Sequence, residues 1–111
     1  METKKCGAVT IAYAMPRLDV QTSPEFGTEL QAIIAAGAKT LVCNLAKTEY
    51  VSSAGLRTIL AAAKTLKRSG GELCLCSVSP LVYKVIEAAA LTDILRVFQS
   101  EEEALETLAT P

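Results

Sequence analysis

Residues 50–57 read Tyr-Val-Ser-Ser-Ala-Gly-Leu-Arg and place a pair of serines between an apolar run and a helical pattern. After the serines, apolar side chains recur every three or four residues, as they do on the buried stripe of an amphipathic helix. These side chains are Leu56, Ile59, Leu60, Ala63 and Leu66. The pattern predicts a helix of about four turns that begins at Ser52 or Ser53 and ends at Ser69, where Gly70 and Gly71 stop it.

Two short apolar runs flank this helix, at residues 40–45 and 72–77. Both are rich enough in β-forming residues to predict buried strands. A strand, a helix and a strand at this spacing form a βαβ unit, whose two strands run parallel. Residues 9–15 alternate as a strand that is apolar on both faces, and residues 1–6 predict a short edge strand. Residues 95–98 predict one more brief strand or extended segment.

A helix is also predicted between the first strands and the βαβ unit. It begins in one of two ways, and the residues leave both open. Either Thr22 is the N-cap and Glu25 closes a capping box, or Ser23 is the N-cap and Pro24 lies in the first turn. An apolar stripe then follows, and Gly37 ends the helix.

Two helices are predicted after the βαβ unit. One begins at Ser79 and Pro80. Its inward side chains are expected to be Leu81, Val82, Val85, Ile86 and Ala89. The other begins with a capping box of Ser100 and Glu103. The chain therefore predicts an α/β fold, one domain over residues 1–111, with a mixed sheet of about four to five strands and about four helices packed on it.

The composition suits one domain with an ordinary apolar core. The chain has 111 residues, of which 50% are hydrophobic, and a net charge of -1. A core of that size needs neither a metal nor disulfides, and the charge gives no electrostatic footprint for direct nucleic-acid binding. Lys64, Lys67 and Arg68 form the one basic cluster, which we interpret as the solvated end of the predicted helix.

The four cysteines are Cys6, Cys43, Cys74 and Cys76. They form no Cys-x-x-Cys pair, and the chain has no histidine that could complete a metal site. Free cysteines pack as small apolar residues, so buried reduced thiols and a reducing compartment are predicted. No apolar stretch reaches the roughly 20 residues of a membrane span. We therefore expect a cytoplasmic protein.

The sequence offers little for catalysis. Without histidine, a serine triad or a Cys-His pair is excluded, and no Ser-x-x-Lys arrangement occurs. Gly70 and Gly71 follow a helix, whereas phosphate-binding glycine loops precede one. Asp19, Glu25 and Glu29 form no recognisable acid–base or metal-binding set. We therefore expect neither a cofactor nor enzymatic activity.

A serine at the start of a helix has two uses. Its hydroxyl can cap the helix, which contributes about 1 kcal/mol. Alternatively, the free amides and the positive end of the helix dipole make a seat for an anion, including a phosphoryl group carried by the serine. The small side chains of Ala54 and Gly55 would leave the hydroxyl uncovered.

Three stretches together resemble the STAS domain of bacterial anti-sigma factor antagonists: residues 50–57, Arg17-Leu18-Asp19, and residues 70–76, which read Gly-Gly-Glu-Leu-Cys-Leu-Cys. The resemblance runs from about Val9 to Leu108. In that family the switch reads Asp-Ser-Ser/Ala-Gly-Leu, and a partner kinase phosphorylates the first serine after the aspartate. With Gly55-Leu56 fixing the register, Ser53 takes the place of the phosphoacceptor. Ser52 stands where the family usually has aspartate and is a possible second acceptor.

The resemblance also implies partners. In the family, the unphosphorylated domain binds an anti-sigma factor, which is also a serine kinase of the histidine-kinase-like ATPase type. Phosphorylation ends that association, and a PP2C-type phosphatase restores it. The implied partner-binding residues are Asp19, Ser52, Ser53, Ala54, Gly55, Leu56 and Arg57. From the residues alone, the favoured interpretation of Asp19 is a turn residue that bonds its own backbone. Pro16 stands where the family often has glycine.

Two other functions fit the same residues. The chain could be a STAS-like accessory subunit of a membrane transport complex, in which the serine pair caps the helix and no phosphate is ever added. It could also belong to a larger stress-signalling assembly, which an additional N-terminal domain would indicate. Detection of phosphoserine in protein from growing cells would separate the first of these from the switch.

Overall fold

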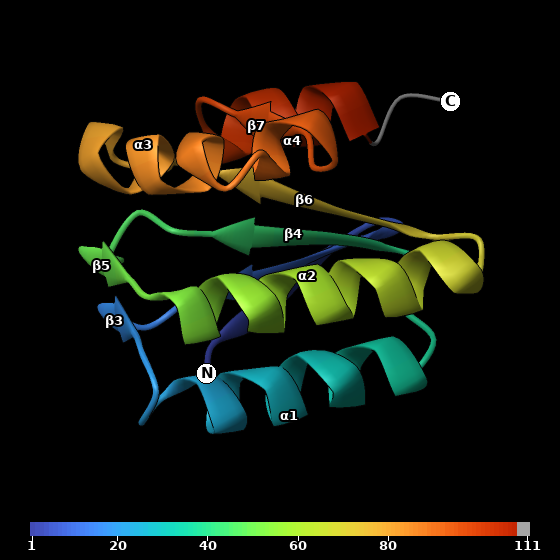
Figure 1. Ribbon diagram of the computed structural model, residues 1–111. Coiled ribbons are helices and arrows are strands. Elements are labelled where there is room, and N and C mark those ends of the chain that lie inside the picture. The colour runs from blue at the N-terminus through green and yellow to red at the C-terminus, as the bar shows by residue number, and fades with distance from the viewer. Residues whose placement is uncertain (109–111) are drawn as a thin grey trace.

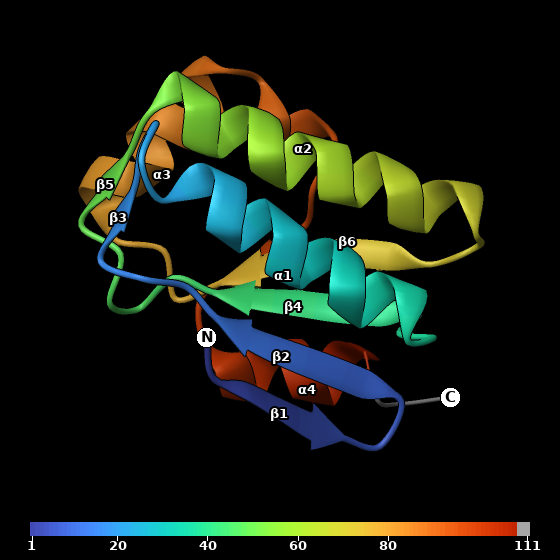
Figure 2. The ribbon, with the colours of Figure 1, turned by 90° about the horizontal axis from the view of Figure 1, so that it is seen from below.

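The computed structural model describes residues 1–108 and is built on a five-stranded sheet (Figures 1 and 2). The strand order is β1-β2-β4-β6-β7. The strands are β1 (Thr3–Cys6), β2 (Val9–Tyr13), β4 (Thr40–Asn44), β6 (Glu72–Cys76) and β7 (Val97–Phe98). The edge strand β1 runs antiparallel to β2, and all other neighbours are parallel. The mixed sheet predicted from the sequence is therefore confirmed.

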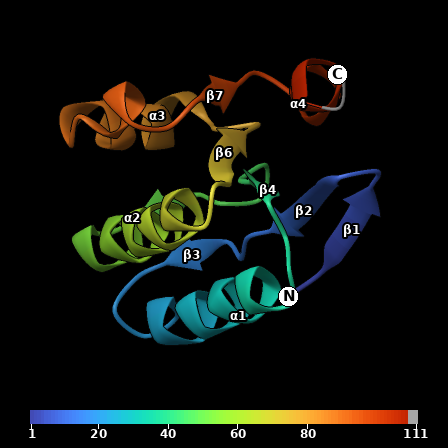
Figure 3. The same cartoon turned by 90° about the vertical axis from the view of Figure 1, so that its right-hand side faces the viewer.

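Four α-helices cover the two faces of the sheet unequally. They are α1 (Ser23–Ala35), α2 (Ser53–Arg68), α3 (Pro80–Ala88) and α4 (Glu101–Leu108), with a short 3₁₀ helix, η1 (Leu91–Asp93), after α3. Figure 3 shows α1, α2 and α3 on one side of the sheet and α4 on the other. This division gives two apolar cores, a large one under the first three helices and a small one under α4.

The large core contains the apolar stripes of α1 and α2. Phe26 and Leu30 of α1 and Ile59 and Leu66 of α2 are fully buried. Because β2, β4 and β6 lie between two layers of helices, they are buried on both faces and read as nearly continuous apolar runs in the sequence. The strand predictions for residues 9–15, 40–45 and 72–77 are confirmed to within two residues at their ends.

A second sheet of two short parallel strands was not predicted. It pairs β3 (Arg17–Leu18) with β5 (Tyr50–Val51). The prediction of a loop at Arg17-Leu18-Asp19 is therefore wrong for its first two residues. Figure 1 shows β3 and β5 at one end of the molecule, next to the amino ends of α1 and α2. The small sheet thereby fixes where the serine pair lies.

Each of the two predicted starts of α1 is confirmed in part, since the N-cap is Thr22, as in the first, and Pro24 lies in the first turn, as in the second. Thr22 occupies the N-cap position, but its side chain makes no capping hydrogen bond. Its hydroxyl donates to the carbonyl oxygen of Arg17 over 2.7 Å, and its amide donates to the Asp19 carboxylate over 3.0 Å. Asp19 thus accepts the hydrogen bond from the Thr22 amide that Glu25 would accept in a capping box.

The inward face of α3 is narrower than the sequence predicted. Val82 and Ile86 are buried, as expected. Leu81 and Val85 are 69% and 37% exposed, and Ala89 is exposed as well. The prediction that these three side chains face inward is wrong, because α3 packs through a single stripe of residues four apart. The Ser100 cap of α4 is confirmed, since its hydroxyl accepts from the Glu103 amide over 3.1 Å.

Candidate functional site

Ser52 is the N-cap of α2. Its backbone is extended, with φ -90° and ψ 175°, and its side-chain oxygen accepts a hydrogen bond from the Gly55 amide over 3.3 Å. Its carbonyl accepts the first intrahelical bond, from the Leu56 amide, over 3.0 Å. The Ser52 side chain is half-buried. One of the two uses predicted for the serine pair, the helix cap, therefore belongs to Ser52.

Ser53 is the first residue of α2 and is exposed. Within residues 1–108, no hydrogen bond involves its hydroxyl group. The amides of Ser53 and Ala54 have no acceptor inside the helix, because an α-helix leaves its first amides unpaired. No acidic residue lies in the first turn. A negative group on Ser53 would therefore meet free donors and the positive end of the helix dipole.

The serine turn is held by the small sheet. The Ser52 amide donates to the Leu18 carbonyl oxygen over 2.8 Å, next to the pairing of Leu18 with Val51. Gly55 packs directly on this connection: a Cβ at position 55 would lie 2.7 Å from the Leu18 carbonyl oxygen and 2.9 Å from its Cβ. Gly55 is thus required for the close approach of α2 to β3, and the rigid contact fixes the position of Ser53.

Asp19 follows Leu18 and lies at the same end of the molecule as the serines. Its carboxylate accepts from the amides of Gln21 and Thr22, each over 3.0 Å, and from Nε of Arg17 over 3.3 Å. The hydrogen bond from the Thr22 amide, aided by those from Arg17 and Gln21, lowers the pKa of Asp19. Of the two interpretations that the sequence left open, Asp19 thus has the contacts of a turn residue. A role in partner binding stays a prediction.

Three large apolar side chains are exposed on the β3–α1 connection, on β5 and on α3, and the sequence did not predict their exposure. Tyr50 is 44% exposed, and the Arg17 guanidinium lies over its ring, 4.4 Å from the centroid. Val20 and Leu81 are 73% and 69% exposed. Leu81 belongs to the first turn of α3, a helix that contacts β5 (Figure 1). No periodic signal marks such residues, since their exposure depends on how α3 and the small sheet pack.

The other residue types that could form a site are buried thiols and scattered acidic side chains. Cys43, Cys74 and Cys76 are buried free thiols, and burial raises the pKa of Cys43 and Cys74 to about 12 and that of Cys76 as well. Within residues 1–108, no three acidic, cysteine or histidine side chains gather where they could hold a metal ion. Among the same residues, no helix combines the length and the apolar character that crossing a membrane requires.

Comparison with known proteins places this geometry in a family. The model of the STAS domain family matches residues 1–104. The chain belongs to the STAS domain family. A relative in Bordetella bronchiseptica, BtrV, whose name classes it with the anti-sigma factor antagonists, is 33% identical over 106 residues. The match covers 96% of this STAS chain and 91% of BtrV. The anti-sigma F factor antagonist of Paenibacillus polymyxa is 29% identical, and the match covers 90% of this chain and 86% of that relative.

Solved structures of STAS proteins share the fold. A crystal structure from Thermotoga maritima, named after the anti-sigma factor antagonists, superimposes with a TM-score of 0.91 at 22% identity, over 98% of this chain and 94% of its own. SpoIIAA, solved in its unphosphorylated form, has a TM-score of 0.83 at 21% identity, over 97% and 95% of the two chains. A second structure of SpoIIAA, solved in the phosphorylated form, has a TM-score of 0.75. At these identities the likeness concerns the fold alone.

Proposed function

We propose that this STAS protein is an anti-sigma factor antagonist, a binding protein and not an enzyme, whose association with its partner is controlled by phosphorylation of Ser53. One observation carries the proposal: the Ser53 hydroxyl is exposed at the amino end of a helix and is bonded to no described residue. The relatives named as anti-sigma factor antagonists support the general function. The existence of a phosphorylated form of SpoIIAA supports the switch by analogy.

Ser53 is a better phosphoacceptor than Ser52 for a geometric reason. The Ser52 hydroxyl is half-buried and engaged with the Gly55 amide, so its phosphorylation would break the helix cap. The Ser53 hydroxyl projects from the first turn without a partner among the described residues, so a kinase can reach it without unfolding α2. Ser52 remains the second candidate.

The fold should tolerate a phosphate at Ser53. A phosphoserine carries about -1.5 to -2 charge units near neutral pH, and the amino end of a helix favours that charge. Arg57 lies one turn further along α2 and forms no ion pair within residues 1–108. Its position four residues after Ser53 suits a charge-assisted contact with the phosphate. The modified domain therefore keeps its structure.

The same phosphate should weaken the interface with the partner. A partner that binds Asp19 and residues 52–57 covers the Ser53 hydroxyl. After phosphorylation, that partner would have to remove water from a doubly charged group close to the ionised Asp19 carboxylate. Burying such a charge against a partner surface that is shaped for a hydroxyl and offers no cation costs several kcal/mol, so the complex dissociates. The partner proposed here is an anti-sigma factor that is also a serine kinase of the histidine-kinase-like ATPase type.

The cycle needs an enzyme that removes the phosphate, and a PP2C-type phosphatase is proposed for this step. The cytoplasm is the proposed location of the STAS protein and its kinase. Neither direct nucleic-acid binding nor a cofactor is part of the proposal, since the recognition is between protein surfaces. A constitutive subunit of a transport complex would instead leave Ser53 unmodified in cells.

The decisive experiment uses a candidate serine kinase of the histidine-kinase-like ATPase type from the same organism, with Mg-ATP, and phosphopeptide mass spectrometry. Wild-type protein and the Ser52→Ala variant are expected to gain one phosphate on Ser53, and Ser53→Ala none. In a binding assay, the affinity of Ser53→Ala for the kinase should equal that of the wild type. The affinity of Ser53→Asp should be lower by about 100-fold or more. Tight binding of Ser53→Asp, or phosphate on a residue other than Ser53, would contradict the proposed switch.

A further inference from the structure

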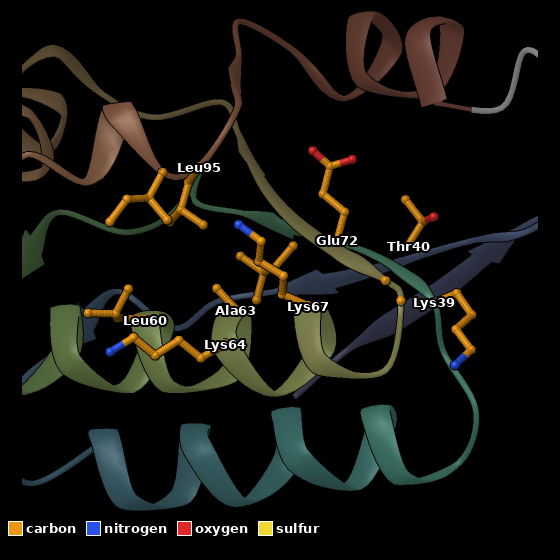
Figure 4. A pocket seen from close by; sticks show the side chains of 12 residues that line it. Lys39, Thr40, Leu60, Ala63, Lys64, Lys67, Glu72 and Leu95 are labelled. Carbon is orange, nitrogen blue, oxygen red and sulfur yellow. The ribbon is translucent and has the colours of Figure 1, made fainter.

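A cavity of about 750 Å³ lies at the opposite end of α2 from Ser53 (Figure 4). It opens between the second half of α2, the amino ends of β4 and β6, and the segment after η1. Since α2 rises about 1.5 Å per residue, the residues of α2 that line the cavity begin roughly 10 Å from Ser53, at Leu60, and extend to roughly 20 Å, at Lys67. It is therefore separate from the partner surface proposed for the serine turn, and its binding chemistry is independent of that function.

The floor of the cavity is apolar. Leu60 and Ala63 line it from α2, and Leu95 lines it from the opposite wall (Figure 4). Ile94, next to Leu95, also lines the cavity and is 60% exposed. A large aliphatic side chain left in water beside an apolar hollow marks a surface that an apolar body would cover favourably. The volume lies within the range of about 300–1,000 Å³ that is usual for sites of small ligands.

The charges around this floor do not cancel. Among the cations, Lys39 donates to the Ser69 carbonyl oxygen over 2.7 Å. The one carboxylate of the lining, Glu72, is held by Arg96 through two hydrogen bonds of 2.7 Å each. Lys64 and Lys67 remain, and the side-chain ammonium group of neither forms an ion pair or a hydrogen bond with another residue of the described chain.

The two unpaired lysines are placed at the edge of the apolar floor. Figure 4 shows the Lys67 side chain rising from α2 toward Leu95, with Lys64 extending along the helix beside Leu60, whereas Lys39 points away from them. The sequence pattern alone indicates a solvated helix end for this basic cluster. In the structure, the two lysines also lie at the positively charged edge of an apolar cavity. The one carboxylate that lines this cavity, Glu72, is already paired with Arg96.

We infer that this cavity binds an organic anion that carries one acidic group on an apolar body, with the chemistry of a medium-chain carboxylate. The apolar body lies on Leu60, Ile94 and Leu95, and the acidic group pairs with Lys64 and Lys67. Neither the two lysines nor the apolar floor is sufficient for binding by itself. Two exposed lysines bind an inorganic anion weakly, because water screens the charges, and an uncharged chain leaves both ammonium groups without a partner.

The test is a titration of the ¹⁵N-labelled full chain with decanoate, followed by amide chemical shifts. Gly70 and Gly71, which line the cavity, serve as reporters. We expect saturable shifts concentrated at the lining residues below the micelle concentration of decanoate. The uncharged analogue decanol and inorganic phosphate, which carry the tail and the charge separately, should each bind at least about tenfold more weakly. Absence of saturation with decanoate, or equal binding of decanol, would overturn the inference.

Substitutions test the charged part and the apolar part of the site separately. Combining Lys64→Gln with Lys67→Gln should weaken decanoate binding by roughly tenfold and leave decanol unchanged. Lys84→Gln, a matched change of an exposed lysine on α3 outside the cavity, should leave decanoate binding unchanged. Ile94→Ser should weaken decanoate and decanol alike. All of these positions are exposed, so the variants are expected to fold, and unaltered shifts elsewhere will verify this. Equal decanoate affinities of the double lysine variant and wild type would overturn the site.

Discussion

At the scale of single residues, the adjacent serines differ because the helix begins between them. Ser52 is extended and caps α2, whereas Ser53 has entered the helix and points to water. The sequence predicted both uses of a serine at this turn. It could not assign them, because the assignment depends on which residue is the first with helical backbone angles, and helix ends are uncertain by one or two residues in any sequence pattern.

The two serines should therefore differ in their effect on stability. Ser52→Ala removes the cap and is expected to lower the free energy of unfolding by about 1 kcal/mol. Ser53→Ala removes a hydroxyl that is bonded to no described residue, and its effect should stay within about 0.5 kcal/mol. Urea denaturation of the two variants and the wild type measures both values. Equal losses for the two variants would mean that Ser52 is not the cap.

Tyr13 gives a second prediction at this scale. Its hydroxyl donates to Oε1 of Glu101 over 2.7 Å, and burial together with this hydrogen bond raises the pKa of Tyr13 to about 12. Because the folded pKa exceeds the unfolded value of about 10, the stabilisation is complete below about pH 10 and is lost as the pH rises toward 12. The difference in phenolate absorbance between the wild type and Tyr13→Phe isolates this titration.

Glu101→Gln should shift the Tyr13 titration toward the ordinary tyrosine value, since it removes the charge that opposes the phenolate while keeping an oxygen that can accept the hydrogen bond. The Asn44 side chain, which donates to the same Glu101 oxygen over 3.0 Å, stays satisfied in this variant. An unchanged midpoint would show that burial alone sets the pKa of Tyr13.

At the scale of elements, the small sheet explains where sequence reasoning stopped. Strands of two residues, such as β3 and β5, are too short to show an alternating pattern, so residues 17 and 18 were expected to form a loop. For α3, in contrast, the predicted inward face was too wide. Leu81, Val82, Val85 and Ile86 are apolar on two sides of the helix, and only the tertiary packing decides which side is buried. The long periodic stretch of α2 left no such ambiguity.

The contact between α2 and β3 can be tested through Gly55. Gly55→Ala would place a Cβ 2.7 Å from the Leu18 carbonyl oxygen, a backbone atom that cannot move without disturbing the β3–β5 pairing. We expect a loss of about 1–3 kcal/mol in the free energy of unfolding. Urea denaturation is the measurement, and a variant as stable as the wild type would contradict the proposed close approach.

Gly27→Ala is the matched control for this substitution. A Cβ at position 27 of α1 would meet the methyl carbon of the Thr58 side chain at 3.1 Å, so a small shift of one side chain accommodates it. Replacing glycine by alanine inside a helix gains up to about 1 kcal/mol in helix propensity, which opposes the crowding. The net change should stay below about 1 kcal/mol, in contrast to Gly55→Ala.

At the scale of the whole molecule, the division of the core into two parts follows from where the apolar side chains of the strands point. Val9, Ile11, Val42 and Cys74 lie in the smaller core, under α4, whereas Ala12, Leu41, Cys43 and Leu75 lie in the larger. Strands that are apolar on both faces indicated from the sequence a position inside the sheet. The sequence did not indicate which helix covers which side, because that choice is made by the chain connections and not by any local pattern.

This layered burial makes the cysteines reporters of the entire fold. Cys43, Cys74 and Cys76 lie inside the sheet, and burial raises the pKa of each thiol, whereas Cys6 is half-buried on the edge strand β1. Because the thiolate is the reactive form, a disulfide reagent such as Ellman's reagent should modify Cys6 quickly in mildly alkaline buffer and the other three thiols only as the molecule opens. In Cys6→Ser the fast phase should vanish, and in concentrated urea all four thiols of the wild type should react at once. A second thiol that reacted as fast as Cys6 in the folded wild type would mean that the sheet opens locally. In that case the two cores could not be the continuous layers that hold the serine turn in place.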